Sequence, residues 1–227
     1  RGRDIKRYYY EWAGLWVIFI PWHFPLHEDL SIQGASEKAE QEFKKQFPSI
    51  YNHLLQFKDA LLKRNKEETG IRYEWYALQR CAATYYPEFE KEKVVWQRIT
   101  QKPTFCLVEP NVFVLDSMAF FTGNNLKFIM AVLNSKIIYE YVNMIVHQYG
   151  FTGFRLSNQY VEVMPLPPIT PSNEHIVKQI ESLVDKILEA KKQNPAADTS
   201  PWEREIDKLV YRLYELTEEE VRIIEKN

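Results

Sequence analysis

Two short stretches of the sequence, Trp75-Tyr76-Ala77-Leu78-Gln79-Arg80 and Lys93-Val94-Val95-Trp96-Gln97-Arg98-Ile99, place Trp and Tyr beside Arg, Gln and Lys. Tyr and Trp have flat apolar faces with one polar tip, while Arg and Gln have forked hydrogen-bonding groups. The packing of a protein core does not require this mixture. It suits a surface that binds another polar polymer, and we consider DNA first.

The second stretch contains an apolar run, Val94–Trp96, that predicts a strand. Four other runs in the first 168 residues have strand-like composition: Trp16–Ile20, Phe105–Val108, Val112–Leu115 and Tyr160–Met164. Helical periodicity occurs in three longer stretches: Glu37–Phe47, Ile50–Arg64 and Leu126–His147, the last with a predicted break near Asn134-Ser135. Because strands and helices do not alternate regularly, we expect an α+β fold.

Four prolines lie within the seven residues from Pro165 to Pro171. Proline cannot continue a helix or a central strand, so this stretch is predicted to be a stiff linker. We therefore expect one mixed domain over residues 1–168 and a separate helical part over residues 169–227.

The part beyond the linker has apolar residues at helical spacing in two stretches, Ile176–Leu188 and Ile206–Tyr214. Thr170-Pro171 and Ser200-Pro201 are the predicted starts of these helices. Thr217 is predicted to cap a last short helix. The pattern predicts an antiparallel helix pair with a short terminal helix, which serves as a structural spacer.

The composition excludes several protein classes. Two cysteines, Cys81 and Cys106, lie far apart and match neither a disulfide framework nor a zinc ribbon, as expected in a reducing cytoplasm. The longest apolar run, Leu15 to Ile20, is far too short to cross a bilayer. The first residues, Arg-Gly-Arg-Asp, show no signal-peptide pattern, and we expect a piece of a longer cytoplasmic protein.

The formal net charge of −2 gives no overall attraction to nucleic acid. Residues 1–165 hold 20 Lys and Arg against 18 Asp and Glu, whereas residues 166–227 hold 9 against 13. The first part is thus mildly basic. Any DNA affinity must come from a local patch, with help from a further domain.

Common catalytic motifs are absent or incomplete. No Asn-Pro-Pro-Tyr-type tetrapeptide is present to hold a flipped base, and no glycine-rich loop follows a strand to hold a cofactor. Glu42-Phe43-Lys44 matches half of a metal-dependent nuclease motif and falls on an amphipathic helix. His23 and His27 are separated by Pro25, which argues against a helical metal pair. We expect no catalytic residue, metal or cofactor in this chain.

A set of basic, amide and aromatic residues remains. Arg and Lys can bind phosphates or guanine, and Asn and Gln can pair with adenine. For any single residue, a role in solubility is the simpler interpretation, and the composition of the whole set fits solubility and DNA binding equally well. The candidate residues are Arg1, Arg3, Lys6, Arg7, Arg72, Tyr76, Gln79, Arg80, Arg98, Lys102, Arg155 and Asn158.

Several short motifs occur in the order seen in one protein family. They are Arg1-Gly2-Arg3-Asp4-Ile5-Lys6-Arg7-Tyr8, Trp75-Tyr76-x-Leu78-Gln79-Arg80, Lys93-Val94-Val95-Trp96-x-x-Ile99, Leu133-Asn134-Ser135-Lys136 and Pro165-Leu166-Pro167, where x marks a position outside the motif. The chain resembles the TaqI-like C-terminal specificity domain, the target-recognition module of type II restriction–modification enzymes and adenine-specific DNA methyltransferases, including phage-defence (BREX-type) ones. The helical end, from Ala197 to Glu220, resembles the C-terminus of the same proteins.

This resemblance implies a prokaryotic domain that holds double-stranded DNA and reads bases in the major groove. An N-terminal methyltransferase domain of the same parent chain would use S-adenosylmethionine to methylate adenine at N6, and a nuclease often precedes it. The fragment itself would not be an enzyme.

The resemblance also suggests roles for the candidate residues. Residues expected to face phosphates at the junction with the methyltransferase are Arg1, Arg3, Lys6 and Arg7. Residues expected near the duplex are Arg72, Arg80, Arg98 and Arg155. Residues expected to reach bases are Tyr76, Gln79 and Asn158.

The shared motifs are expected to build the scaffold, because family members with different targets share them. Leu133-Asn134-Ser135 is expected to break a helix with a local side-chain hydrogen bond. Base-reading residues are expected in the segments between motifs: Phe24–Ser36, Asn65–Tyr73, Pro103–Asn111 and Phe151–Gln159. An alternative stays open, in which the chain docks the methyltransferase to another subunit without contacting DNA, as the acidic helical end and the near-neutral charge suggest.

Overall fold

The stretch around Val95 forms the centre of the larger of two small sheets. In the computed structural model, which describes residues 1–81, 86–146, 148–150 and 153–226, strand β1 (Lys93–Gln97) lies between β3 (Phe105–Val108) and β4 (Met118–Phe121). Both pairings are antiparallel, and Val95 lies opposite Cys106 of β3. The predicted strands at Val94–Trp96 and Phe105–Val108 are therefore confirmed.

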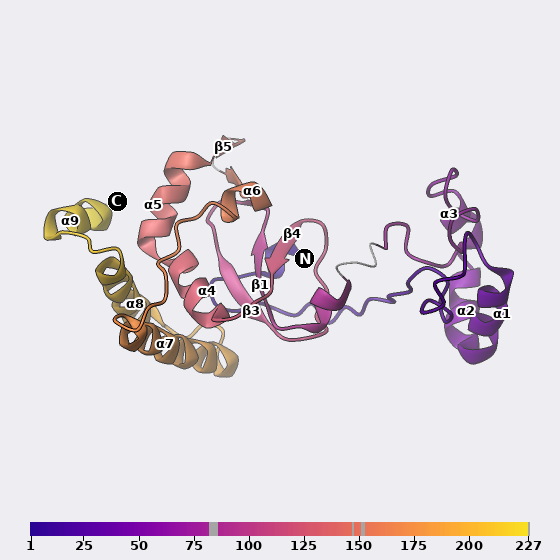
Figure 1. Ribbon diagram of the computed structural model, residues 1–227, viewed down its shortest axis with the longest axis horizontal. Coiled ribbons are helices and arrows are strands. Elements are labelled where there is room, and N and C mark those ends of the chain that lie inside the picture. Colours follow the sequence, from indigo (N-terminus) through magenta and orange to yellow (C-terminus); the bar gives the residue numbers. More distant parts are fainter. Residues whose placement is uncertain (82–85, 147, 151–152, 227) are drawn as a thin grey trace. The chain divides into compact units, whose positions relative to one another are not determined.

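One face of this sheet is covered by helices. Because side chains alternate along a strand, Val94 and Trp96 point to the same face, where α4 (Leu126–Asn134) packs. Helices α7 (Glu174–Gln193) and α8 (Ser200–Leu213) pack on α4 and contribute to the same apolar core. Figure 1 shows this order of sheet, α4 and the C-terminal helices.

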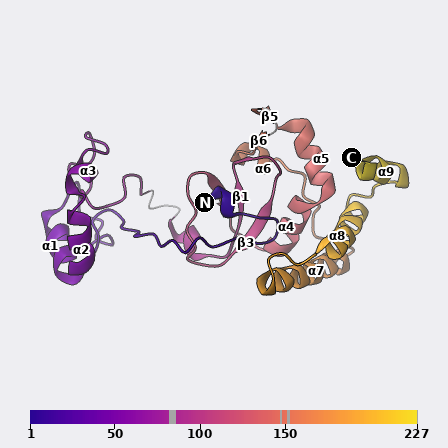
Figure 2. The same cartoon turned by 180° about the vertical axis from the view of Figure 1, so that it is seen from behind.

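The opposite face of the sheet carries Val95 and Cys106, and the N-terminal segment packs there. This segment begins with a 3₁₀ turn, η1 (Gly2–Asp4), and its Ile5 is buried against Val95. Figure 2 shows the segment beside β1.

A second, smaller sheet has the order β2-β6-β5 and is antiparallel throughout. Its strands are β2 (Ile99–Thr100), β5 (Gln148–Tyr149) and β6 (Gly153–Arg155). The remaining elements of this part are the 3₁₀ helix η2 (Tyr86–Glu90) and helices α5 (Lys136–Ile145), α6 (Asn158–Val161) and α9 (Glu218–Lys226). The small sheet was not predicted, because strands of two or three residues carry almost no periodicity.

The chain divides into two compact units. The sheet unit comprises Arg1–Leu15 and Glu88–Asn227, and the inserted unit comprises Trp16–Pro87. The inserted unit holds helices α1 (Glu37–Gln46), α2 (Pro48–Leu55) and α3 (Lys58–Leu62). Its own core is mostly aromatic and contains Phe43, Tyr51, Tyr73, Trp75 and Tyr76.

The α+β fold class is confirmed, whereas the predicted boundary at residues 168 and 169 separates two sequence patterns and not two compact units. Helices α7 and α8 complete the core of the sheet unit, since Ile180, Val184 and Val210 are fully buried in it. The proposed division of labour between a recognition domain and a helical spacer stays a prediction.

Three predicted strands are wrong. Trp16–Ile20 forms no strand, Val112–Leu115 precedes the real strand β4, and Tyr160–Met164 overlaps the short helix α6. Val112 and Val114 still pack on the sheet without backbone pairing. Apolar runs show which segments are buried, but the hydrogen-bond partner of each segment depends on the tertiary arrangement.

The helices were predicted more accurately. Helix α1 begins at Glu37 as expected, and the break near Asn134-Ser135 separates α4 from α5. Thr217 caps α9, because its Oγ1 accepts a hydrogen bond from Glu220 N. Helix α7 begins later than expected, at Glu174, and the residue before α8 is Thr199, so Ser200 is the first helical residue.

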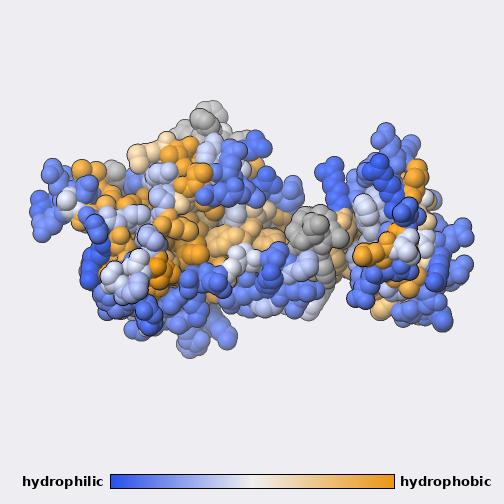
Figure 3. All heavy atoms as spheres, in the orientation of Figure 1, coloured by the Kyte–Doolittle hydropathy of each residue, from blue (hydrophilic) through white to orange (hydrophobic). Residues whose placement is uncertain are grey.

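The surface differs between regions of the sheet unit. Apolar residues gather over its middle on the face shown in Figure 3, while charged residues dominate along α7. Among the described residues, no helix is long and apolar enough to cross a membrane.

Candidate nucleic-acid interface

The N-terminal segment is fixed to the sheet through its apolar residues. Ile5 and Tyr8 are buried, Ile5 forms a bridge with Tyr10, and Tyr8 N donates a hydrogen bond of 3.1 Å to Phe105 O. Burial raises the pKa of Tyr8, so its hydroxyl stays protonated beside the Arg7 guanidinium. The basic residues between these anchors are thereby held at the sheet surface.

A side chain of the motif Leu133-Asn134-Ser135 supports the same attachment. Asn134 Oδ1 accepts from Phe105 N at 3.0 Å, and Asn134 Nδ2 donates to Phe105 O at 2.9 Å. Ser135 Oγ donates to Val132 O, which is the local hydrogen bond expected at the helix break. Asn134 thus links the end of α4 to β3 and, through Phe105 O, to the N-terminal segment.

The loop after β2 faces this segment. Thr100 Oγ1 donates to Lys102 O at 2.7 Å and accepts from Lys102 N at 3.3 Å. These two bonds order a tight turn that leaves Gln101 and Lys102 exposed. The Lys102 ammonium lies 5.7 Å from the ring centroid of Tyr139 on α5, a cation–π distance.

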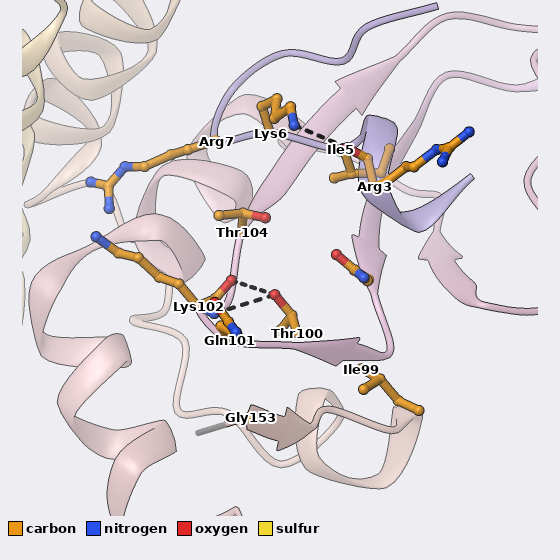
Figure 4. A pocket seen from close by; sticks show the side chains of 11 residues that line it. Arg3, Ile5, Lys6, Arg7, Ile99, Thr100, Gln101, Lys102, Thr104 and Gly153 are labelled. Atoms are coloured by element: carbon orange, nitrogen blue, oxygen red, sulfur yellow. Dashed lines mark hydrogen bonds between the residues drawn. The ribbon is translucent and has the colours of Figure 1, made fainter. Parts of the chain in front are cut away.

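Between the N-terminal segment and this loop lies an open pocket of about 630 Å³ (Figure 4). Its lining contains four cationic side chains and, among the described residues, no carboxylate. The lining residues are Arg3, Ile5, Lys6, Arg7, Gln97, Ile99, Thr100, Gln101, Lys102, Thr104 and Gly153. We call this the basic pocket.

The four cations differ in their present contacts. Lys6 Nζ donates to Arg3 O at 3.0 Å, and Arg3 is 74% exposed, with its Nε 3.9 Å from Asp4. Arg7 Nε lies 2.6 Å from a Glu203 carboxylate oxygen of α8 without the geometry of a hydrogen bond. In Figure 4 the Arg7 and Lys102 side chains extend toward the same side of the pocket, and Arg3 extends toward the opposite side.

Arg1 lies beside the basic pocket and does not line it. Its Nε donates to Asp4 at 3.0 Å, and this contact is the main cause that holds the pKa of the Asp4 carboxyl below its ordinary value. Asp4 therefore stays ionised and offsets the charge of Arg1.

The structure brings together four of the twelve predicted site residues, Arg3, Lys6, Arg7 and Lys102. Besides Arg1, three others belong to the sheet unit but lie outside the basic pocket. Arg98 contacts Asp116 at 3.4 Å, and Arg155 is exposed opposite Ile99 in the small sheet. Asn158 lines a different, mostly apolar pocket.

The remaining four predicted residues, Arg72, Tyr76, Gln79 and Arg80, belong to the inserted unit. Tyr76 is only 4% exposed, its hydroxyl donates to Phe24 O at 2.9 Å, and its ring packs on Phe43. A ring buried in this way has no free face for a base, so we leave Tyr76 out of the proposed DNA surface. Arg72 pairs with Glu68, and Arg80 is exposed.

The buried residues of the two stretches Trp75–Arg80 and Lys93–Ile99 contribute to the cores of their own units. Trp75 Nε1 donates to Glu40 at 2.7 Å within the inserted unit, and Trp96 Nε1 donates to Leu156 O at 3.0 Å within the sheet unit. Val94 and Val95 are fully buried.

Sequence reasoning did not select Gln97, Thr100, Gln101 and Thr104. The alternation of side chains along a strand does place Gln97 on the same face of β1 as Val95. The N-terminal segment packs on that face, but the sequence does not show this. The segments expected to read bases are not tested by these contacts, and residues 151–152 of Phe151–Gln159 lie outside the described residues. Thr104 places one of these segments, Pro103–Asn111, at the pocket.

The features weighed for metal binding and nuclease chemistry have other contacts. His23 Nδ1 lies 3.0 Å from the buried carboxylate of Glu74, which also accepts from Ser36 N. Glu42 contacts Gln46 and Lys45 on the surface of α1. The part of the chain that the structure describes contains no group of three or more His, Cys, Asp or Glu placed to hold a metal ion.

Comparison with known proteins gives one family. The model of the TaqI-like C-terminal specificity domain matches residues 1–166. A search of curated proteins finds no match. The family match ends within the proline-rich stretch Pro165–Pro171 and includes the inserted unit and every residue of the basic pocket.

Proposed function

Because the chain belongs to the family of TaqI-like C-terminal specificity domains, whose role is DNA target recognition in restriction–modification systems, we propose that the basic pocket is the surface that holds the DNA backbone. The observation that carries this proposal is the lining of the pocket. Arg3, Lys6, Arg7 and Lys102 come from two segments, and no carboxylate stands among them in the described lining.

Charge explains why this pocket suits DNA despite a net charge of −2. Duplex DNA carries a phosphate about every 3.4 Å along each strand, and cations that neutralise phosphates release condensed counterions. A local group of four cations can release these counterions even though the chain as a whole is not basic. From the helical end, Glu203 of α8 forms an ion pair with Arg7 and partly offsets the charge of that arginine.

We further propose that the domain positions duplex DNA for N6-adenine methylation by a methyltransferase domain of the same parent protein. That domain would bind S-adenosylmethionine, and this chain would supply only DNA contacts, as a specificity domain does. The parent would act in the prokaryotic cytoplasm in restriction–modification and phage defence. Because the specificity domain and the methyltransferase domain would belong to one chain, DNA bound by the first would hold the target adenine near the reacting group of the second.

Salt dependence of DNA binding tests the proposed surface. Lys6→Ala, Lys102→Ala and Arg3→Ala should each weaken binding to all duplex sequences alike and reduce the slope of log K against log salt by about one. Lys178→Ala is the matched control, because Lys178 is exposed on α7 and lies outside the pocket. Unchanged affinity and slope in all three pocket variants would contradict the proposal.

A second function, docking to another subunit, is favoured by one observation. An apolar pocket of about 260 Å³ is lined by Phe120, Phe121, Val161 and Leu166 among other residues. Crosslinking of the intact parent protein to DNA separates the two functions. Docking alone predicts no crosslinks from residues 1–165, whereas DNA binding predicts crosslinks at the N-terminal segment and the loop after β2.

A further inference from the structure

Gln97 occupies a defined place at the end of a rigid strand. It is the last residue of β1 and lies opposite Met118 of β4. It faces the same side of the sheet as Val95, where the N-terminal segment packs. A recognition group on a strand is held more precisely than one on a loop.

Gly2 leaves room for the Gln97 side chain. A Cβ atom at position 2 would lie 3.0 Å from both Cγ and Nε2 of Gln97. Gly2 is buried in the turn η1, so the Gln97 side chain lies directly against the backbone of the N-terminal segment. The missing side chain of Gly2 therefore helps to set where the Gln97 amide lies.

The Gln97 amide is available for a ligand. This side-chain amide makes no hydrogen bond within the part of the chain that the structure describes. Gln97 is half-buried and lines the basic pocket. By contrast, Gln101 lies in the exposed loop after β2. A half-buried amide without a partner, flanked by cations, is suited to a ligand that has both a donor and an acceptor beside phosphates.

We propose that Gln97 reads one adenine of the DNA target and that Gly2 is its positioning residue. The Gln97 amide oxygen would accept a hydrogen bond from adenine N6, and the amide nitrogen would donate to adenine N7 in the major groove. This inference rests on the proposed function, because the cations of the basic pocket must first hold the backbone.

The test is selection of bound duplexes from a randomised DNA pool, followed by sequencing, with the full 227-residue chain. The wild-type chain should enrich a motif with an A·T pair. Gln97→Ala should lose discrimination at that one position by about 5- to 150-fold while affinity for random DNA and its salt slope stay unchanged. Gln97→Glu should shift the preference toward cytosine, because a carboxylate accepts from cytosine N4.

Gly2→Ala separates positioning from contact. It should weaken discrimination at the same position and at no other, because the added Cβ displaces the Gln97 side chain. The double variant Gly2→Ala/Gln97→Ala should lose no more than Gln97→Ala alone, as expected for two changes that act through one group. Gln179→Ala, at an exposed site on α7, is the control and should keep the wild-type motif.

The outcomes distinguish this inference from the proposed function. If Gln97→Ala enriches the same motif as the wild type, or loses affinity equally for all sequences, the proposed base contact is wrong. The proposed DNA surface still stands in that case if Arg3→Ala, Lys6→Ala and Lys102→Ala weaken binding. No enriched motif in the wild-type chain, or binding that is indifferent to Arg3, Lys6 and Lys102, overturns the proposed function and the inference with it. Thermal melting of each variant shows whether a loss reflects unfolding.

Discussion

Lys93 shows how a charged residue can belong to the scaffold. Its side chain is fully buried, and its ammonium donates to three carbonyl oxygens, those of Phe89, Lys91 and Glu109. Burial lowers the pKa of Lys93, since the three carbonyls replace water only in part. In the sequence, Lys93 looks like any surface lysine at the start of a strand.

We expect Lys93→Met to lower the free energy of unfolding by about 2–4 kcal/mol, because three buried carbonyls lose their donor. Urea denaturation measures this change. Lys91→Met is the control, since Lys91 is exposed and its ammonium contacts Glu88 at the surface. Equal effects of the two substitutions would show that the buried hydrogen bonds do not matter.

Tyr51 makes stability depend on alkaline pH. Its hydroxyl donates to Glu40 at 2.9 Å, and burial together with this carboxylate raises the pKa of Tyr51 to about 12. A raised pKa contributes stability that is complete below the unfolded value of about 10 and is lost as the pH rises through the folded value. Urea unfolding should therefore show that the free energy of unfolding falls less between pH 9 and pH 12 in Tyr51→Phe than in the wild type.

At the scale of elements, the junction of α4 and α5 connects the helical core to β3, which borders the N-terminal segment. Asn134 is buried, and its amide satisfies both backbone groups of Phe105 on the edge strand β3. The sequence predicts the helix break at this place but not the partner of Asn134, because the two residues are 29 positions apart.

Asn134→Ala should lower the free energy of unfolding by about 1–3 kcal/mol, since Phe105 N loses its acceptor in a buried site. Asn143→Ala on the exposed side of α5 is the matched control and should change stability by less than about 0.5 kcal/mol. Chemical denaturation of both variants checks this difference. A similar loss in both would contradict the role of the Asn134 amide.

At the scale of the whole molecule, two units with separate cores share one chain. The inserted unit interrupts the sheet unit between Leu15 and Glu88, and its core is built from rings packed on Phe43. Separate cores imply that each unit can lose structure without the other.

Phe43→Ala should destabilise the inserted unit by about 3–5 kcal/mol, because it removes a buried ring from the centre of that core. Hydrogen exchange followed by mass spectrometry should show faster exchange in α1 and α2 and unchanged exchange in α4 and α7. Phe57→Ala is the control, since Phe57 is 48% exposed. Equally faster exchange in α4 would show that the two units unfold together.

The sequence by itself determined the fold class, most helices, the two paired strands around Val95 and the family. These follow from patterns that are local, namely periodicity, helix breaks and ordered short motifs. It also identified four cations of the basic pocket, because they cluster in two short segments.

Only the tertiary structure decided which residues share a surface. In the folded chain, Tyr76 is buried in a core and Asn158 lines an apolar pocket. Helices α7 and α8 pack in the core of the sheet unit, and Gln97 lies against Gly2. The physical reason is that burial and pairing depend on contacts between residues distant in sequence. A polar aromatic residue such as Tyr76 has the same local pattern whether its ring is packed inside or free to bind.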